Sequence, residues 1–252
     1  MSAIHVESIG KNSLPTLVML HGWGCSSEML HPLAALMTDK AHSLLVDLPG
    51  FGRSEAPQGV WSAFDYADAL VAYMNETGLA KIDLLGHSFG GKVAMSLAIR
   101  YPERLGKLVL ICPAGLKRRY SFVDNCRFSA IRMTGKLIKL IDRTCHTTYH
   151  SQYFSPRFGS KDYLNATGIV RSILVKSVNE DYTHFLSKIS TPTLILSAEH
   201  DNVTPPETAQ RLHQGIRTSR LYVFPEKDHY PFQDVGAHLC AHYIKEFLNE
   251  ES

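Results

Sequence analysis

Short apolar runs alternate with amphipathic helical patterns along most of this chain, and this alternation is what most restricts its fold. Six runs have the character of buried strands: 16–20, 43–47, 82–85, 108–112, 193–197 and 220–224. Helical patterns cover 26–37, 63–77, 89–100, 206–214 and 235–249. Such alternation is typical of βαβ units and a parallel sheet, and near-continuous apolar strands fit a sheet covered on both faces. The sequence therefore predicts an α/β fold with a mostly parallel central sheet flanked by helices.

The alternation is interrupted once. After the run at 108–112, residues 115–187 contain helical patterns and loops but no convincing buried strand, and strand character resumes at Thr193. Pro113 and Pro192 flank this stretch as breakers. We therefore expect a single core built from 1–114 and 188–252, with 115–187 inserted as a helical lid or cap. A chain of 252 residues is long enough for one large core of this kind.

A serine lies between two glycines where the run at 82–85 meets the helical pattern at 89–100. The sequence Gly86-His87-Ser88-Phe89-Gly90-Gly91 is a G-x-S-x-G motif in a strand–turn–helix context, which presents a nucleophilic serine on a strained turn. Gly86 and Gly90 leave room for that turn. A helix-capping serine in a glycine-rich turn would give the same local pattern, but the strand and helix on either side favour a nucleophile.

The first apolar run ends in His21-Gly22-Trp23-Gly24. Acyl transfer needs two backbone N–H groups aimed at the oxygen of the tetrahedral intermediate. We expect one from Phe89, directly after the nucleophile, and the other from Trp23. Taken alone, the second segment would be interpreted as a tight turn with a buried tryptophan.

Three motifs occur in a defined order: HGWG at 21–24, VDLPGFGRS at 46–54 and GHSFGG at 86–91. Together they resemble the α/β-hydrolase superfamily, specifically its lid-bearing serine esterases, over nearly the whole chain except the details of 115–187. HGWG and DLPGFGRS are also similar to the pimeloyl-carrier-protein methyl ester esterases of biotin synthesis, whose partner is acidic. One departure is the short N-terminus, which has room for only one strand, at 4–9, before Thr16.

The resemblance implies a triad in the order serine, acid, histidine. Asp201 occupies the position of the acid, in the loop after the run at 193–197 and four residues before Pro205, with Glu199 as the alternative. His229 follows the last run, in a loop where a base can reach the serine while an acid holds its other nitrogen. His238 and His242 are expected to be structural or solvated.

These assignments predict a serine hydrolase that cleaves a small or medium carboxylic ester through an acyl-enzyme intermediate, with Ser88 as nucleophile, His229 as base and Asp201 as supporting acid. A serine at this position argues against the haloalkane dehalogenases and epoxide hydrolases of the superfamily, which have aspartate there. Three alternatives stay open: a carbon–carbon bond hydrolase, a carrier-protein methyl ester esterase, and a non-catalytic receptor on the same fold.

The charge of the chain is unevenly distributed. The formal net charge is +2, from 26 basic and 24 acidic residues, which gives no general attraction to nucleic acid. Within 117–150, eight basic residues oppose two acidic ones, which gives +6 and leaves −4 for the remainder. The eight are Lys117, Arg118, Arg119, Arg127, Arg132, Lys136, Lys139 and Arg143. We favour a solvated helical face, with an acidic substrate or partner as the alternative interpretation.

The remaining features concern the cellular location of the protein and possible metal binding. The five cysteines have no CxxC spacing and are expected to be free thiols, as in a reducing compartment. The first ten residues do not resemble a signal peptide, and no apolar run is long enough to cross a bilayer, so we expect a cytoplasmic protein without membrane insertion. His146 and His150 are spaced as a helical ligand pair, but the glutamate of the metalloprotease motif is missing. The predicted chemistry needs neither metal nor cofactor.

Overall fold

A seven-stranded sheet forms the centre of the computed structural model, which describes residues 4–118, 122–154, 157 and 160–250. Its strand order is β1-β3-β2-β4-β5-β6-β7, and every neighbouring pair is parallel except β1 with β3. The strands are β1 (His5–Ile9), β2 (Thr16–Leu20), β3 (His42–Asp47), β4 (Ile82–His87), β5 (Leu105–Ile111), β6 (Thr193–Ala198) and β7 (Ser219–Phe224). The apolar runs thus form the strands that the sequence predicts.

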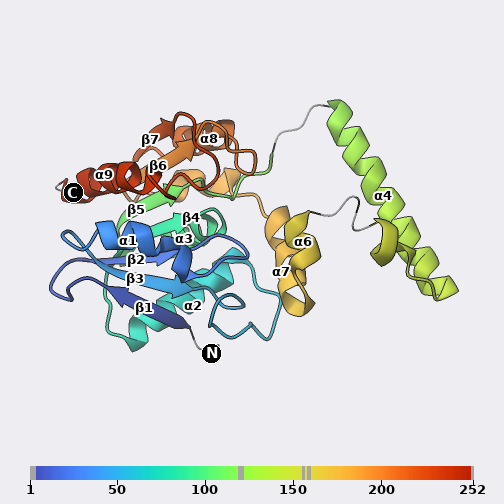
Figure 1. Ribbon diagram of the computed structural model, residues 1–252, viewed down its shortest axis with the longest axis horizontal. Coiled ribbons are helices and arrows are strands. Elements are labelled where there is room, and N and C mark those ends of the chain that lie inside the picture. Colours follow the sequence, from blue (N-terminus) through green and yellow to red (C-terminus); the bar gives the residue numbers. More distant parts are fainter. Residues whose placement is uncertain (1–3, 119–121, 155–156, 158–159, 251–252) are drawn as a thin grey trace.

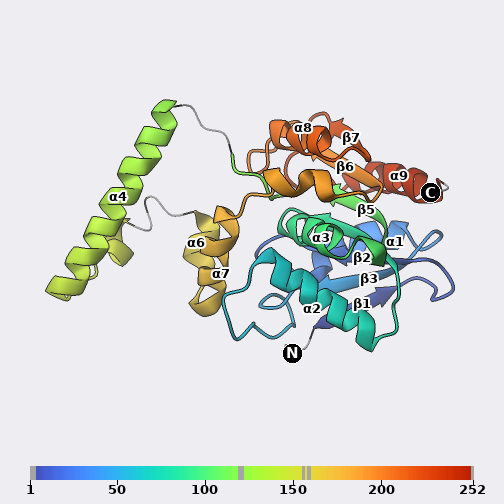
Figure 2. The same cartoon turned by 180° about the vertical axis from the view of Figure 1, so that it is seen from behind.

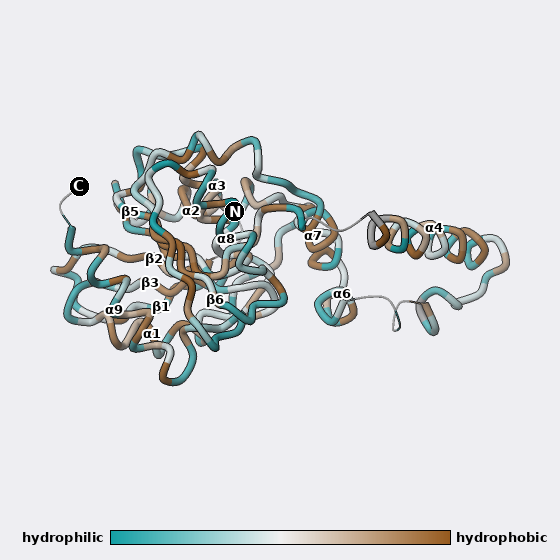
Figure 3. Tube along the Cα trace, turned by 90° about the horizontal axis from the view of Figure 1, so that it is seen from above, coloured by the Kyte–Doolittle hydropathy of each residue, from teal (hydrophilic) through white to brown (hydrophobic). Residues whose placement is uncertain are grey.

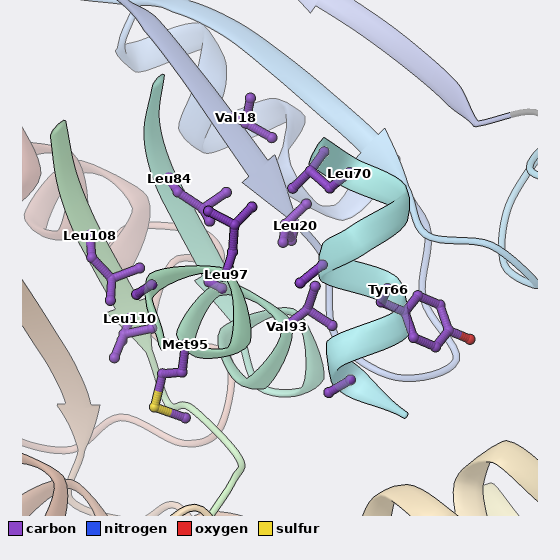
Figure 4. Close-up of a cluster of buried hydrophobic side chains, with 14 of the residues drawn as sticks. Val18, Leu20, Tyr66, Leu70, Leu84, Val93, Met95, Leu97, Leu108 and Leu110 are labelled. Atoms are coloured by element: carbon purple, nitrogen blue, oxygen red, sulfur yellow. The ribbon is translucent and has the colours of Figure 1, made fainter. Parts of the chain in front are cut away.

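Helices cover both faces of this sheet (Figure 1). One face packs against α2 (Ala63–Glu76), α3 (Phe89–Arg100) and α8 (Pro206–Gly215), the other against α1 (His31–Leu36) and α9 (Gly236–Asn249). Side chains on the first face interlock around Leu20, Leu84 and Val93, which are fully buried (Figure 4). Alternate residues of each strand enter opposite layers. Leu17 and Met19 of β2 accordingly belong to the second core.

Two helices show how local sequence sets the boundaries. In α2, Ser62 accepts a hydrogen bond from the Asp65 amide while the Asp65 carboxylate accepts one from the Ser62 amide, a reciprocal capping box that starts the helix. The helix expected over 26–37 is divided into the 3-10 helix η1 (Ser27–Leu30) and α1. Pro32 lies in the first turn of α1, where its missing N–H costs nothing, so a new helix begins there.

Between β5 and β6 the described residues form helices and loops. They include α4 (Phe122–Cys145), the π-helix η3 (His150–Phe154), α6 (Lys161–Asn165), α7 (Gly168–Asn179) and the 3-10 helix η4 (Thr183–Lys188). Figures 1 and 2 show α7 next to the core and α4 standing well away from it. Viewed from above, α4 carries both hydrophobic and hydrophilic positions along its length (Figure 3). Within the part of the chain that is described, no helix has the length and apolar character needed to span a bilayer.

Candidate active site

Ser88 lies at the turn between β4 and α3, in a backbone conformation that side chains rarely adopt. Its φ of 50° and ψ of −110° are strained for a residue with a side chain. The glycines around it make this turn sterically feasible. A Cβ at Gly86 would lie 2.4 Å from the Gly90 carbonyl oxygen, and one at Gly90 would lie 2.5 Å from the Leu20 carbonyl oxygen. Substitution at either glycine would therefore displace the turn that carries Ser88.

The structure brings Ser88, His229 and Asp201 together from three separate loops. His229 Nε2 lies 3.0 Å from Ser88 Oγ, and His229 Nδ1 lies 2.7 Å from Asp201 Oδ2. An ionised carboxylate only accepts hydrogen bonds, so Nδ1 carries the proton and Nε2 accepts from the serine hydroxyl. This is the arrangement in which a histidine can take the proton of a serine.

The carboxylate of Asp201 is fixed from both sides. The backbone N–H groups of Val203 and Thr204 both donate to Oδ1 at 2.8 Å, and the Thr204 hydroxyl donates to Oδ2 at 2.7 Å. Burial by itself raises the pKa of Asp201, but the hydrogen bonds from His229 and Thr204 outweigh it and hold the pKa below its usual range. Asp201 therefore faces His229 as an anion.

The other candidates from the sequence lie elsewhere. Glu199 is exposed, and its carboxylate accepts the backbone N–H of Glu226 at 3.2 Å instead of contacting His229. His238 and His242 are exposed on α9.

The two histidines considered as a metal-ligand pair are separated in the structure. His146 follows the end of α4 and His150 begins η3, so the two do not share one helix face.

Two buried histidines support the site without facing the cavity. His87 Nε2 donates to the carbonyl oxygen of His229 at 2.9 Å, which ties the histidine loop to the end of β4. Burial lowers the pKa of His87 to about 3. His21 accepts the Leu48 amide at Nε2 (3.0 Å) and donates from Nδ1 to the Gly22 carbonyl (2.7 Å), and burial lowers its pKa as well. Both rings are therefore neutral, and their hydrogen bonds hold the neighbouring backbone in place.

The loop that carries Trp23 approaches the first turn of α3. The Trp23 and Phe89 rings meet edge to face, with centroids 5.1 Å apart. Phe89 is the first residue of α3, so its N–H has no partner within the helix and points out of the helix N-terminus. Asp47 anchors the loop, because its carboxylate accepts the N–H of Ser27 at 2.6 Å and of Arg53 at 2.9 Å. Trp23, Ser88 and Phe89 line one cavity.

This cavity has a volume of about 560 Å³ and extends from Ser88 toward the inserted segment. Its wall contains Lys92, one turn beyond Ser88 on α3 and only 3% exposed. Lys92 Nζ donates to the carbonyl and hydroxyl oxygens of Ser177 at the end of α7 and lies 3.7 Å from the Glu180 carboxylate. Burial lowers the pKa of Lys92, an effect that Glu180 opposes.

Sequence reasoning missed the roles of Lys92 and Thr204. A lysine in an otherwise apolar and glycine-rich helical stretch was a signal that it is buried and paired. Ser177 is 85 positions away, however, and Glu180 lies beyond it, so only the fold reveals these partners. Thr204 is three residues from Asp201, within reach of a side-chain-to-backbone turn, so a local signal existed.

The sheet is mostly parallel and carries a serine on a strained strand-to-helix turn, and a histidine and an aspartate lie on later loops. This combination defines the α/β-hydrolase class of enzymes. The family model described as "alpha/beta hydrolase fold" matches residues 15–234. The chain belongs to this family.

Named relatives extend over almost the whole chain. The chain is 26% identical to a pimeloyl-[acyl-carrier protein] methyl ester esterase of Nitrosomonas europaea, covering 92% of this chain and 94% of that protein. It is also 26% identical to a 2-hydroxy-6-oxononadienedioate/2-hydroxy-6-oxononatrienedioate hydrolase of a Pseudomonas species, over 90% of this chain and 86% of that protein. The named activities among these relatives are those of hydrolases and esterases, and this chain is a hydrolase of the same kind.

Solved structures share the fold at lower sequence identity. A hydrolase from Pseudomonas aeruginosa superimposes with a TM-score of 0.75 at 19% identity, covering 99% of this chain and 95% of the other. An esterase from Thermogutta terrifontis superimposes with a TM-score of 0.73 at 24% identity, over 98% and 93%. At these identities the likeness concerns the fold alone.

Proposed function

We propose that this protein hydrolyses a carboxylic ester through an acyl-enzyme intermediate formed on Ser88. The observation that carries the proposal is the continuous chain of hydrogen-bonding contacts from Ser88 Oγ through His229 to Asp201, with distances of 3.0 and 2.7 Å. His229 takes the proton of Ser88 as the hydroxyl oxygen attacks the ester carbonyl, and then returns it to the leaving alcohol. A water molecule activated by the same histidine releases the acid. Asp201 orients the imidazole and stabilises its positive charge.

In this mechanism the backbone N–H groups of Trp23 and Phe89 donate to the oxyanion of the tetrahedral intermediate. Their position beside Ser88 on the cavity wall supports that assignment. The inserted segment 115–187 is proposed to act as a lid, because residues of α7 and Leu116 line the same cavity. The pocket of about 560 Å³ is large enough for a small or medium acyl group.

A second candidate is hydrolysis of a carbon–carbon bond in a ring-cleavage product. It is favoured by the similarity to the Pseudomonas hydrolase, which is as high in identity as that to the methyl ester esterase. The two reactions share the attacking and proton-transferring groups, so the substrate distinguishes them. The natural acyl donor, including a carrier-protein methyl ester, would be determined by the cavity wall and the inserted segment rather than by the three central residues.

Hydrolysis of p-nitrophenyl esters of increasing acyl length tests the proposal, with wild type beside Ser88→Ala. We expect turnover to peak at one chain length and to fall by about 10³-fold or more in the variant, because the nucleophile is lost. Alanine fits the tight elbow, and the circular dichroism spectrum of the variant should match wild type. Undiminished hydrolysis by a purified, folded Ser88→Ala would overturn the nucleophile. A folded wild type that hydrolyses dienoate ring-cleavage products and no ester would favour the second candidate.

Asp201→Asn is expected to lower kcat by about 10⁴-fold, by analogy with the same change in a serine-protease triad. An amide at this position favours the wrong tautomer of His229 and no longer stabilises its cation. Glu199→Gln is the matched control, since Glu199 is an exposed acid of the same loop. Its kcat should stay close to wild type, and a larger loss in Glu199→Gln than in Asp201→Asn would reverse the assignment of the acid.

A further inference from the structure

The helix α4 presents an apolar row of side chains that the rest of the described chain leaves uncovered. Met133, Leu137, Leu140 and Ile141 recur at the spacing of one helix face and are 72%, 58%, 59% and 46% exposed. With 24 residues, α4 is roughly 36 Å long. Figures 1 and 2 show this helix clear of the sheet and of its covering helices. A row of large apolar side chains exposed on this scale marks an interaction surface.

A second face of α4 is already occupied within the chain. Gly135 is buried there, and a Cβ at this position would lie 2.7 Å from the ring of Phe154 in η3. Ile131 and Ile138 on the same side are half-buried. Because η3 covers this face, the row of Met133, Leu137, Leu140 and Ile141 is left facing outward.

A basic row runs beside the apolar row. Arg132, Lys136, Lys139 and Arg143 are each exposed. The first three lie about 100° around the helix from the apolar side chains that directly follow them, and Arg143 continues the row one turn further on. In the described part of the chain no ion pair involves any of the four. Arg119, which the sequence places in the same basic segment, lies outside the described residues.

Aromatic and acidic groups at the end of α4 complete this surface. Tyr149 and Tyr153 are 61% and 66% exposed, and they line a shared depression with Ile141. The carboxylate of Asp142 accepts the Thr147 hydroxyl and the N–H groups of Tyr149 and His150. This acid is therefore engaged in folding the chain back after α4 and leaves the positive charge of the basic row in excess.

We propose that α4 docks this protein on the surface of an anionic lipid bilayer, with the apolar row in the acyl boundary and the basic row against the headgroups. An amphipathic helix with cationic residues beside an apolar face binds such a surface, and tyrosines favour the depth of the headgroups. The apolar row is a ridge along one straight helix, which a bilayer accommodates without a preformed groove. The basic row gives the charge complementarity to anionic lipid. The helix lies in the interface and does not cross the membrane.

This docking goes beyond the proposed hydrolysis and does not depend on it. Arg132 belongs both to the basic row and to the wall of the cavity that contains Ser88. Docking through α4 would therefore place the outer end of that cavity near the lipid surface. A hydrophobic ester could then pass from the bilayer to the site without crossing bulk water.

Co-sedimentation with vesicles tests the proposal. Wild type should bind phosphatidylcholine vesicles containing about one third phosphatidylglycerol and bind pure phosphatidylcholine much more weakly. Lys136→Glu/Lys139→Glu should lower the partition coefficient by at least about tenfold through lost headgroup attraction. Leu137→Ser/Leu140→Ser should lower it by a similar factor through lost apolar burial. Lys11→Glu and Val235→Ser, at exposed positions away from α4, are matched controls and should bind as wild type does.

A fluorescence measurement locates the contact. Leu137→Trp should show blue-shifted emission on anionic vesicles, whereas Val235→Trp should not. Wild type that ignores anionic vesicles, or binding that the leucine and lysine variants leave unchanged, would overturn the proposal. Binding lost in the lysine variant alone would also overturn it, because the apolar row would then lie outside the bilayer.

Three further outcomes would assign α4 to another occupant and so overturn the proposal. Each combines failure to bind vesicles with one other result. The first is tight binding to a purified acidic acyl carrier protein, and the second is a dimer in sedimentation that Leu137→Ser/Leu140→Ser dissociates. The third is loss of soluble-ester hydrolysis in that variant. All arms use the full chain. Since hydrolysis of a soluble ester is measured separately from vesicle binding, failure of one proposal is distinguishable from failure of the other.

Discussion

His87, next to the proposed nucleophile, illustrates how one residue can hold a site together without taking part in the chemistry. Its ring is completely enclosed, and it donates to the carbonyl of His229 from the end of β4. Among the residues that the structure describes, none forms a hydrogen bond with its buried Nδ1, and a Cβ on Gly22 would lie 2.8 Å from this atom. The position therefore requires a neutral ring, a close glycine and a histidine loop fixed by its backbone.

This burial makes stability depend on pH. The pKa of His87 is lowered to about 3 in the folded protein, against about 6.5 in an unfolded chain. Between these values the unfolded chain binds the extra proton, so the free energy of unfolding is undiminished by His87 above about pH 6.5. It falls as the pH decreases toward 3, by up to about 1.4 kcal/mol per pH unit. Urea denaturation from pH 8 to pH 5 should show this decline.

His87→Gln is expected to flatten that decline, because the amide cannot titrate. The free energy of unfolding at pH 8 should be lower than that of wild type, although the amide can still donate to the His229 carbonyl. His238→Gln is the matched control, since His238 is exposed on α9, and it should keep the wild-type slope. An unchanged slope in His87→Gln would show that other groups, such as the buried His21, dominate the pH dependence.

At the scale of elements, the sequence predicted most where local signals and burial agree. The strand at 16–20 and the helix at 89–100 are present with the expected bounds, because apolar runs and glycine-rich turns delimit them. The helix expected at 26–37 is interrupted where Pro32 starts a new turn. The distance of α4 from the core was not predictable, because an amphipathic pattern indicates a face to be covered but does not identify what covers it.

The candidate site was predictable to the same extent. Ser88, His229 and Asp201 are brought together because parallel strands present their carboxyl ends at one edge of the sheet, where loops meet. The contacts of Lys92 were not predictable, because they depend on how α7 packs against α3. Long-range packing of this kind leaves no periodic signal in the sequence.

At the scale of the whole molecule, the two cores determine which part of the inserted segment the fold needs. Ile173 of α7 belongs to the core between the sheet, α2 and α3, and α7 also accepts hydrogen bonds from Lys92. No described residue from 117 to 168 belongs to either core cluster. The fold should therefore tolerate the loss of α4 and should depend on α7.

Replacing residues 119–160 by a flexible Gly/Ser linker of about fifteen residues tests this division. We expect a cooperative urea transition with a free energy of unfolding within about 1 kcal/mol of wild type, since shortening a surface connection changes loop entropy only slowly. The m-value should fall little, because it follows the surface exposed on unfolding, and α4 is largely exposed already. Removing residues 168–179 instead is the matched control, and it should cost several kcal/mol, because it strips apolar side chains from the core and leaves Lys92 without Ser177. Loss of the cooperative transition in the first variant would show that α4 is part of the folding unit.

With the fold retained, the same variant should no longer bind anionic vesicles, because the surface proposed to dock there is gone.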